Sequence, residues 1–149
     1  MDGSTCSSRI DEFDVNIFQV PIAFVDKAWR DGAHKLSEAA EKSGGEITGE
    51  QLRLILTRGE RILLGMGDET QVTAWAAVQI QQLPNLRACY IYCIWAPGST
   101  SAKAFELLKK YAADNGCSCI RGACNDVISR LWQIKFKARK VYTVLEMDV

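Results

Sequence analysis

The segment Cys89–Gly116 constrains the fold of this chain more than any other segment. It begins with an apolar run typical of a buried strand, passes through Pro97-Gly98 and a group of small hydroxyl residues, and then carries apolar residues at every third or fourth position. This pattern predicts a strand, a tight turn and a long amphipathic helix that stops at Gly116. Such a unit places backbone amides at a helix N-terminus, where they can hold phosphate.

The residues before this segment predict an antiparallel meander. Three strand signals follow one another, at Arg61–Met66, Gln71–Gln81 and Arg87–Trp95. Turn residues at 67–69 and 84–85 join them, and connections this short cannot form a parallel crossover. The three strands are therefore expected to lie side by side in one sheet.

The N-terminal third predicts one strand and two helices. Ile10–Val20 reads as a strand, and Phe24–Lys42 has helical periodicity that Gly32 weakens or splits. Thr48 and Gln51 have the spacing of a capping box, which predicts a short second helix. Residues 1–9 are expected to form a flexible tail before a single domain that spans residues 10–149.

After Gly116 the chain predicts three more elements. Cys117–Cys124 reads as a strand parallel to Arg87–Trp95, because a helix crosses between them. A short helix at Asp126–Ile134 and a closing strand at Val141–Met147 follow. The expected order is β-α-α-β-β-β-α-β-α-β, an α+β fold whose mixed sheet combines an antiparallel meander with one parallel pair. A ligand crevice is expected where the two parallel strands splay apart.

Composition excludes several classes of function. Eighteen basic and 18 acidic residues give a formal net charge of zero, which argues against a nucleic-acid partner. No apolar run is long enough to span a membrane, and the polar, acidic start does not resemble a signal peptide, so a cytoplasmic protein is expected. The six cysteines include no C-x-x-C pair and the single histidine, His34, is remote from them, so no metal site is expected.

The element order, with this loop in this place, resembles the GNAT superfamily of N-acetyltransferases. Members of that family carry an Arg/Gln-x-x-Gly-x-Gly/Ala loop whose amides hold the pyrophosphate of acetyl-CoA. Here the matching residues are Ser99-x-x-Ala102-x-Ala104, so the small residues are kept while the basic or amide side chain is replaced. The resemblance implies acetyl-CoA as the acyl donor and the following cofactor-binding residues: Ile94, Trp95, Ser99, Thr100, Ser101, Ala102, Lys103, Ala104 and Asn125.

The catalytic residues are less well defined by this resemblance. Trp132 stands where many relatives carry a tyrosine that protonates the departing thiolate, and an indole cannot serve as such an acid near neutral pH. Tyr90 and Tyr92 are the nearest ionisable candidates on the preceding strand, although tyrosines at such positions are more often packing residues.

Two functions follow from these observations. The first is an N-acetyltransferase acting on an unidentified amine. The alternative is a non-catalytic GNAT-like structural or accessory protein, for example a component of a phage virion, which would place it in the virion and give it a protein partner. The hydroxyl-rich turn also has a purely structural interpretation, in which Ser99, Thr100 or Ser101 caps the helix.

Overall fold

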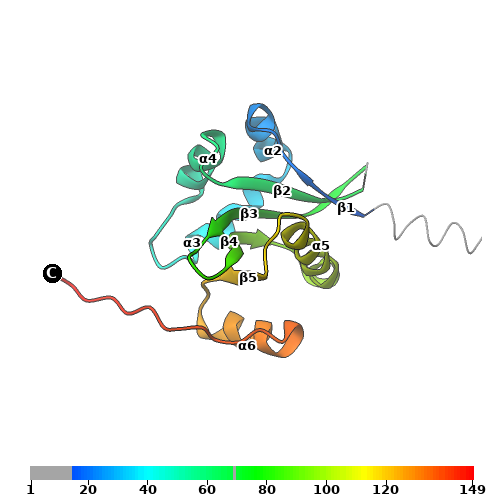
Figure 1. The fold of residues 1–149 in the computed structure, drawn as a ribbon. Coiled ribbons are helices and arrows are strands. Elements are labelled where there is room, and N and C mark those ends of the chain that lie inside the picture. Colours follow the sequence, from blue (N-terminus) through cyan, green and yellow to red (C-terminus); the bar gives the residue numbers. More distant parts are fainter. Residues whose placement is uncertain (1–14, 69) are drawn as a thin grey trace, which may run out of the picture.

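The computed structural model describes residues 15–68 and 70–149. It shows a five-stranded sheet with helices on both faces (Figure 1). The predicted α+β class and the mixed sheet are confirmed. The expected tail at residues 1–9 and the first part of the expected strand, residues 10–14, lie outside the described residues.

The sheet follows the order of the chain. Its strands are β1 (Asn16–Gln19), β2 (Ile62–Gly67), β3 (Val72–Gln82), β4 (Arg87–Trp95) and β5 (Cys119–Gly122), and they lie in the order β1-β2-β3-β4-β5. The first three pairings are antiparallel and the β4–β5 pairing is parallel. The predicted meander and the predicted parallel pair are both confirmed.

The N-terminal helices cover one face of the sheet, which we call the α2 face. They are the 3-10 turn η1 (Ile22–Phe24), α2 (Val25–Asp31), the 3-10 turn η2 (Ala33–Leu36), α3 (Ser37–Glu41) and α4 (Gly49–Thr57). Gly32 divides the expected helix, as its low helix propensity predicts. The core on this face consists of apolar side chains that include Trp29, Leu36, Leu52, Leu56, Leu63, Trp75, Ala77 and Cys93.

The capping box predicted for α4 is present. The Gln51 amide donates to Thr48 Oγ1 over 3.2 Å, and the Thr48 amide donates to Gln51 Oε1 over 3.0 Å. Both bonds satisfy donors that the first turn of a helix otherwise leaves open. This cap fixes where α4 begins, so Leu52 and Leu56 face the core.

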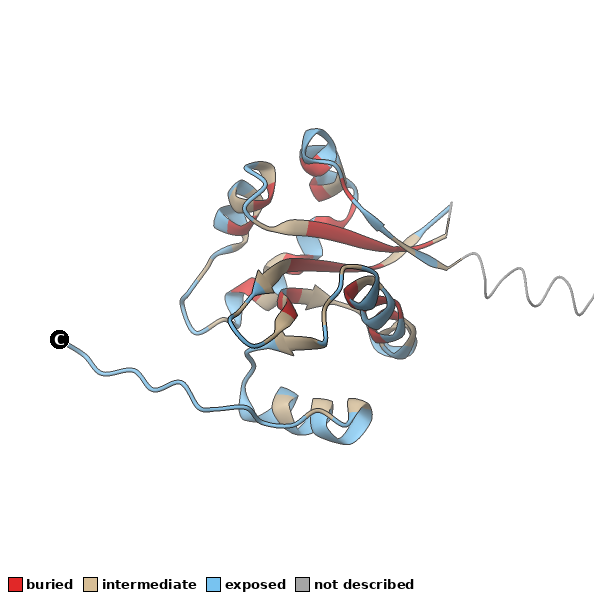
Figure 2. Ribbon diagram, in the orientation of Figure 1, coloured by how far each residue is buried: buried red, intermediate tan, exposed pale blue. Residues whose placement is uncertain are grey.

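The opposite face, which we call the α5 face, is covered by the C-terminal helices. The 3-10 turn η3 (Gly98–Thr100) leads into α5 (Ser101–Asp114), and α6 (Asp126–Phe136) follows β5. Buried residues of α5, among them Phe105 and Leu108, pack against the sheet. α6 has no fully buried residue and lies at the edge of the domain, as Figure 2 shows. None of the helices in the described part of the chain has both the length and the apolar character needed to cross a membrane.

The closing strand expected at Val141–Met147 is wrong. Residues 137–149 form no helix or strand, and Leu145 and Met147 are 87% and 90% exposed (Figure 2). The composition of this segment suits a strand, but a strand needs an edge that donates and accepts backbone hydrogen bonds. No described strand pairs with the segment, so its alternating apolar residues are not enough to make it a strand.

Candidate functional site

The parallel strands β4 and β5 separate next to the start of α5. Their pairing runs from Ala88 opposite Cys119 to Ile91 opposite Gly122, whereas β4 continues to Trp95. The last residues of β4 therefore extend beyond the end of β5. On the side that faces β5, their backbone has no neighbouring strand among the described residues. The sequence predicts a ligand crevice at this place, because ligands in open α/β sheets bind at the carboxyl ends of parallel strands.

A β-bulge lies in β4 where the pairing with β5 ends. Cys93 pairs with Ala77 and Ile91 pairs with Val78, so Tyr92 is an extra residue without its own partner on β3. The bulge changes which face the later side chains join. Ile91 packs in the core of the α5 face, whereas Cys93 packs in the core of the α2 face. Bulges of this kind often stand next to active sites because they redirect side chains and interrupt pairing.

The turn between β4 and α5 leaves the helix N-terminus without a side-chain cap. Thr100 Oγ1 donates to the Pro97 carbonyl over 2.7 Å, and Ser101 Oγ donates to the Gly98 carbonyl over 3.1 Å. Neither hydroxyl accepts from an α5 amide. The structural interpretation of this turn, in which one of its hydroxyls caps the helix, is therefore wrong. The positive end of α5 remains available to an anion from outside the chain.

The predicted phosphate-binding residues differ in their exposure. Ser99 and Ala102 are exposed, and Lys103 places its ammonium 3.7 Å from the Glu106 carboxylate. Ala104 is only 2% exposed and packs in the core of the α5 face, so only its backbone could meet a ligand. At the end of β4, Ile94 and Trp95 are partly buried on opposite faces of the sheet.

Asn125 and Trp132 have structural roles in α6. Asn125 Oδ1 accepts from the Ile128 amide over 3.0 Å and caps the helix. The Trp132 ring meets Phe105 edge-on with centroids 5.0 Å apart, and Phe136 stacks on Phe105 at 4.2 Å. Trp132 also lies over Gly122, where a Cβ would come within 3.2 Å of its ring. The indole thus fills the space beside the end of β5.

The two candidate tyrosines share a surface on the α2 face but differ in their contacts. Their ring centroids are 4.7 Å apart. The Tyr92 hydroxyl donates to Gln79 Oε1 over 3.1 Å, and the Arg61 guanidinium lies 4.1 Å from the centre of its ring. The Tyr90 hydroxyl makes no hydrogen bond to any other described residue. Of the two phenols, Tyr90 is therefore the one free to meet a ligand.

Burial, followed by the neighbouring Tyr92, raises the pKa of Tyr90. Smaller contributions to this raised pKa come from Tyr142, Glu46 and Cys124. The sequence pattern did not point to these three residues, which lie in the C-terminal segment, in the α3–α4 loop and in the loop between β5 and α6. A phenol with a raised pKa is protonated at neutral pH, so Tyr90 can give a proton but cannot act as a base there.

The cysteines add no nucleophile or metal centre to this region. The five described cysteines are free thiols, and burial raises the pKa of Cys89 and of Cys93 to about 11. Thiols with such pKa values carry almost no thiolate at neutral pH and are inert. Within residues 15–68 and 70–149, no three His, Cys, Asp or Glu side chains are placed to hold a metal ion.

Comparison with known proteins finds similarity in structure but not in sequence. No family model matches the chain, and no curated protein matches it in sequence. Among solved structures, it is similar to an aminoglycoside acetyltransferase from an uncultured soil metagenomic sample, in complex with sisomicin, with a TM-score of 0.63 and 11% identity. That alignment covers 93% of this chain and 98% of the other.

Two further structures agree with this similarity. A ribosomal-protein-alanine N-acetyltransferase from Brucella melitensis biovar Abortus 2308 has a TM-score of 0.64 and 14% identity over 91% of this chain and 99% of its own. A predicted acetyltransferase from Clostridium acetobutylicum, solved with acetyl-CoA, has a TM-score of 0.60 and 14% identity over 90% and 96%. The chain has the fold of the GNAT acetyltransferases.

Proposed function

We propose that this protein is an N-acetyltransferase that moves an acetyl group from acetyl-CoA to an amine. The observation that carries the proposal is the separation of β4 from β5 beside the uncapped N-terminus of α5. One element offers unpaired strand backbone and the other offers helix amides, so an extended ligand with an anionic group can contact both. The similarity to structures that contain CoA or acetyl-CoA supports this choice of ligand.

In this proposal, the pyrophosphate rests on the amides of Ser101, Ala102 and Lys103. The pantetheine arm runs along the free edge of β4 beyond Ile91, and the amide of Ile94 or Trp95 polarises the thioester carbonyl. The acceptor nitrogen attacks the carbonyl carbon, so a C–N bond forms and the C–S bond breaks. The amine loses one proton, and the CoA thiolate takes up one proton as it leaves.

Tyr90 is our candidate for the group that gives this proton. Its hydroxyl has no other hydrogen-bond partner among the described residues, and its raised pKa keeps it protonated at neutral pH. Tyr92 is a positioning residue, because its hydroxyl is engaged by Gln79 and its ring packs against Tyr90. The proposal therefore gives the two tyrosines different roles.

A non-catalytic protein of the same fold is the second candidate, and one observation favours it. Trp132 occupies the position of the expected tyrosine and is packed against Phe105, so that position supplies neither an acid nor a free side chain. Nothing in the comparisons supports the more specific alternative of a phage virion component.

Calorimetric titration of the purified protein with acetyl-CoA and with CoA tests the proposal. Saturable binding of both, followed by acetyl transfer to at least one member of a panel of amines, would support an enzyme. Tyr90→Phe should then lower kcat more than it raises KM, because it removes a proton donor and leaves the ring in place. A protein that binds neither form of CoA would instead be the non-catalytic module.

A further inference from the structure

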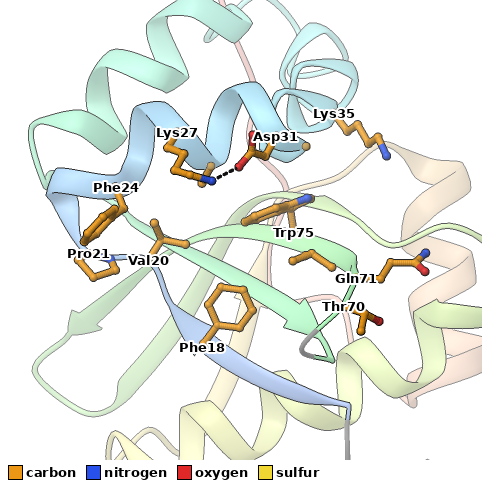
Figure 3. Close-up of a pocket in the computed structure, with 13 residues that line it drawn as sticks. Phe18, Val20, Pro21, Phe24, Lys27, Asp31, Lys35, Thr70, Gln71 and Trp75 are labelled. Carbon is orange, nitrogen blue, oxygen red and sulfur yellow. Dashed lines mark hydrogen bonds and ion pairs between the residues drawn. The ribbon is translucent and has the colours of Figure 1, made fainter.

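A hollow open to the surface lies on the α2 face. It has a volume of about 610 Å³ and is bordered by α2, β1 and the start of β3 (Figure 3). This volume falls within the range of pockets that hold small molecules, roughly 300–1,000 Å³. The N-terminus of α5 lies on the opposite face of the sheet, so this hollow is separate from the proposed phosphate site.

The hollow contains a hydrogen-bond donor without an acceptor. Trp75 lines it and is only 4% exposed, yet its indole N–H donates to no other described residue. The nitrogen is not sealed in the core, because no side-chain nitrogen or oxygen of the described residues is both fully buried and unpartnered. A ligand that covers this nitrogen must therefore accept its hydrogen bond, because covering the N–H without an acceptor would cost free energy.

Gly32 keeps the indole nitrogen accessible. A Cβ at this position would stand 3.1 Å from Trp75 Nε1, closer than side chains normally pack. The backbone of Gly32 is extended, with a φ of 170°, so its conformation does not require glycine. The missing side chain instead avoids crowding the indole ring on the side of its nitrogen.

Among the described residues that line the hollow, one positive charge has no ion-pair partner. Lys27 pairs with Asp31 over 2.6 Å, whereas Lys35 makes no ion pair with the described residues. The Lys35 ammonium lies 4.3 Å from the centre of the Trp95 ring, and Trp95 is the residue opposite Trp75 in the β3–β4 pairing. Lys35 and Trp75 therefore line the same hollow with an ammonium and an N–H group that have no acceptor among the described residues, a combination that suits a carboxylate.

The remaining wall is aromatic. Phe18 and Phe24 line the hollow, although they are 41% and 58% exposed, and Phe18 meets Trp75 edge-on with ring centroids 6.5 Å apart. Large apolar side chains that stay exposed around a concave surface gain contact area when a flat apolar ligand covers them. Figure 3 shows Phe18 and Phe24 on β1 and at the start of the helical segment, with Trp75 between that segment and the sheet.

We propose that this hollow is a binding site for a small aromatic carboxylate. The ring of the ligand packs against Phe18, Phe24 and Trp75, and its carboxylate accepts from the Trp75 indole N–H and the Lys35 ammonium. This assignment does not rest on the proposed acetyl transfer.

The test uses phenylacetate as the probe, without CoA, and follows the indole N–H signals of the four tryptophans by nuclear magnetic resonance. Trp75→Phe assigns the Trp75 signal, because it removes only that N–H. We expect phenylacetate to shift the Trp75 signal saturably. Phenethylamine and 2-phenylethanol have the same ring without the carboxylate, so both should bind more weakly.

Two variants and one control locate the site. Lys35→Gln should weaken phenylacetate binding about tenfold, the size of one charge-assisted contact, whereas the exposed Lys42→Gln should leave it unchanged. Gly32→Ala should abolish the Trp75 shift while the other tryptophan signals keep their positions. The proposal is overturned if the Trp75 signal does not move, if phenethylamine binds as tightly as phenylacetate, or if the two lysine variants bind equally.

Discussion

Ala102→Glu separates binding from folding at the proposed phosphate site. Ala102 is exposed in the first turn of α5, where the uncapped amides would meet the pyrophosphate. Ala113→Glu is the matched control, because Ala113 is also exposed but lies in the last turn of the same helix. Both variants add the same side chain and the same charge, and only one adds it where CoA is proposed to bind.

The expected loss of CoA affinity follows from Coulomb's law. Two unit charges 4 Å apart repel by about 1 kcal/mol in water and by about 4 kcal/mol at the effective dielectric constant of a protein surface. Because the pyrophosphate carries about two charges, the carboxylate introduced by Ala102→Glu should cost at least about 2 kcal/mol, which is a loss of about 30-fold. The control variant stands near the other end of α5, so its affinity should match that of the original protein.

The expected effect of either variant on the free energy of unfolding is small. An acidic residue in the first turn gains about 0.3–1 kcal/mol from the helix dipole. Repulsion from Glu106 at i+4 costs about 0.2–0.5 kcal/mol and the lower helix propensity of Glu costs a few tenths, so Ala102→Glu should be close to neutral. Ala113→Glu places a negative charge at the negative end of α5 and should destabilise by about 0.5 kcal/mol.

Calorimetric titration with CoA and thermal unfolding of the three proteins give the comparison. The reasoning is refuted if the Ala102→Glu protein binds CoA as tightly as the original protein. It is also refuted if both variants lose affinity equally, because binding would then depend on the charge of the helix and not on its N-terminus.

Three further predictions concern stability and reactivity. Leu108→Ala, at a fully buried position, should lower the free energy of unfolding by about 3 kcal/mol, whereas Leu54→Ala, at a position 52% exposed, should cost less than about 1 kcal/mol in the same denaturant titration. Cys89 and Cys93 should resist iodoacetamide in the native protein and react after denaturation, as mass spectrometry of tryptic peptides would show, and rapid native labelling would contradict their burial and their pKa of about 11. Deleting residues 140–149 should leave the unfolding midpoint unchanged in circular dichroism, because these residues bury no apolar side chain in the fold, and a large drop would show that they pack against it.

Local patterns were sufficient to predict most elements of this fold. Alternation identified β3, and periodicity identified α5, because each of these elements buries one face. Gly32 and the Thr48–Gln51 capping box marked helix boundaries correctly because both act through neighbouring backbone. The parallel pairing of β4 and β5 followed from topology, since a helix joins the two strands.

Features that depend on residues far apart in the sequence, or on a choice between hydrogen-bond partners, could not be predicted from local patterns. The bulge at Tyr92 exists only in the register between β3 and β4, so the residues of β4 alone give no sign of it. The hydroxyls of Thr100 and Ser101 could have capped α5 or bonded to preceding carbonyls, and the sequence allows both. The hollow beside Trp75 is assembled from β1, α2 and β3, and Gly32 was interpreted only as a helix breaker.

The C-terminal segment and the outer edge of β5 have a consequence for how copies of the protein meet. Among the described strands β5 has one neighbour, and the segment after α6 exposes apolar side chains in an order that suits a strand. These are two different surfaces, so a contact between the segment of one molecule and the β5 edge of another is heterologous. If two molecules exchange segments reciprocally the contact closes as a dimer, and if they do not each addition leaves a new edge free. By mass action, any such contact would depend on protein concentration, whichever of the two forms it took.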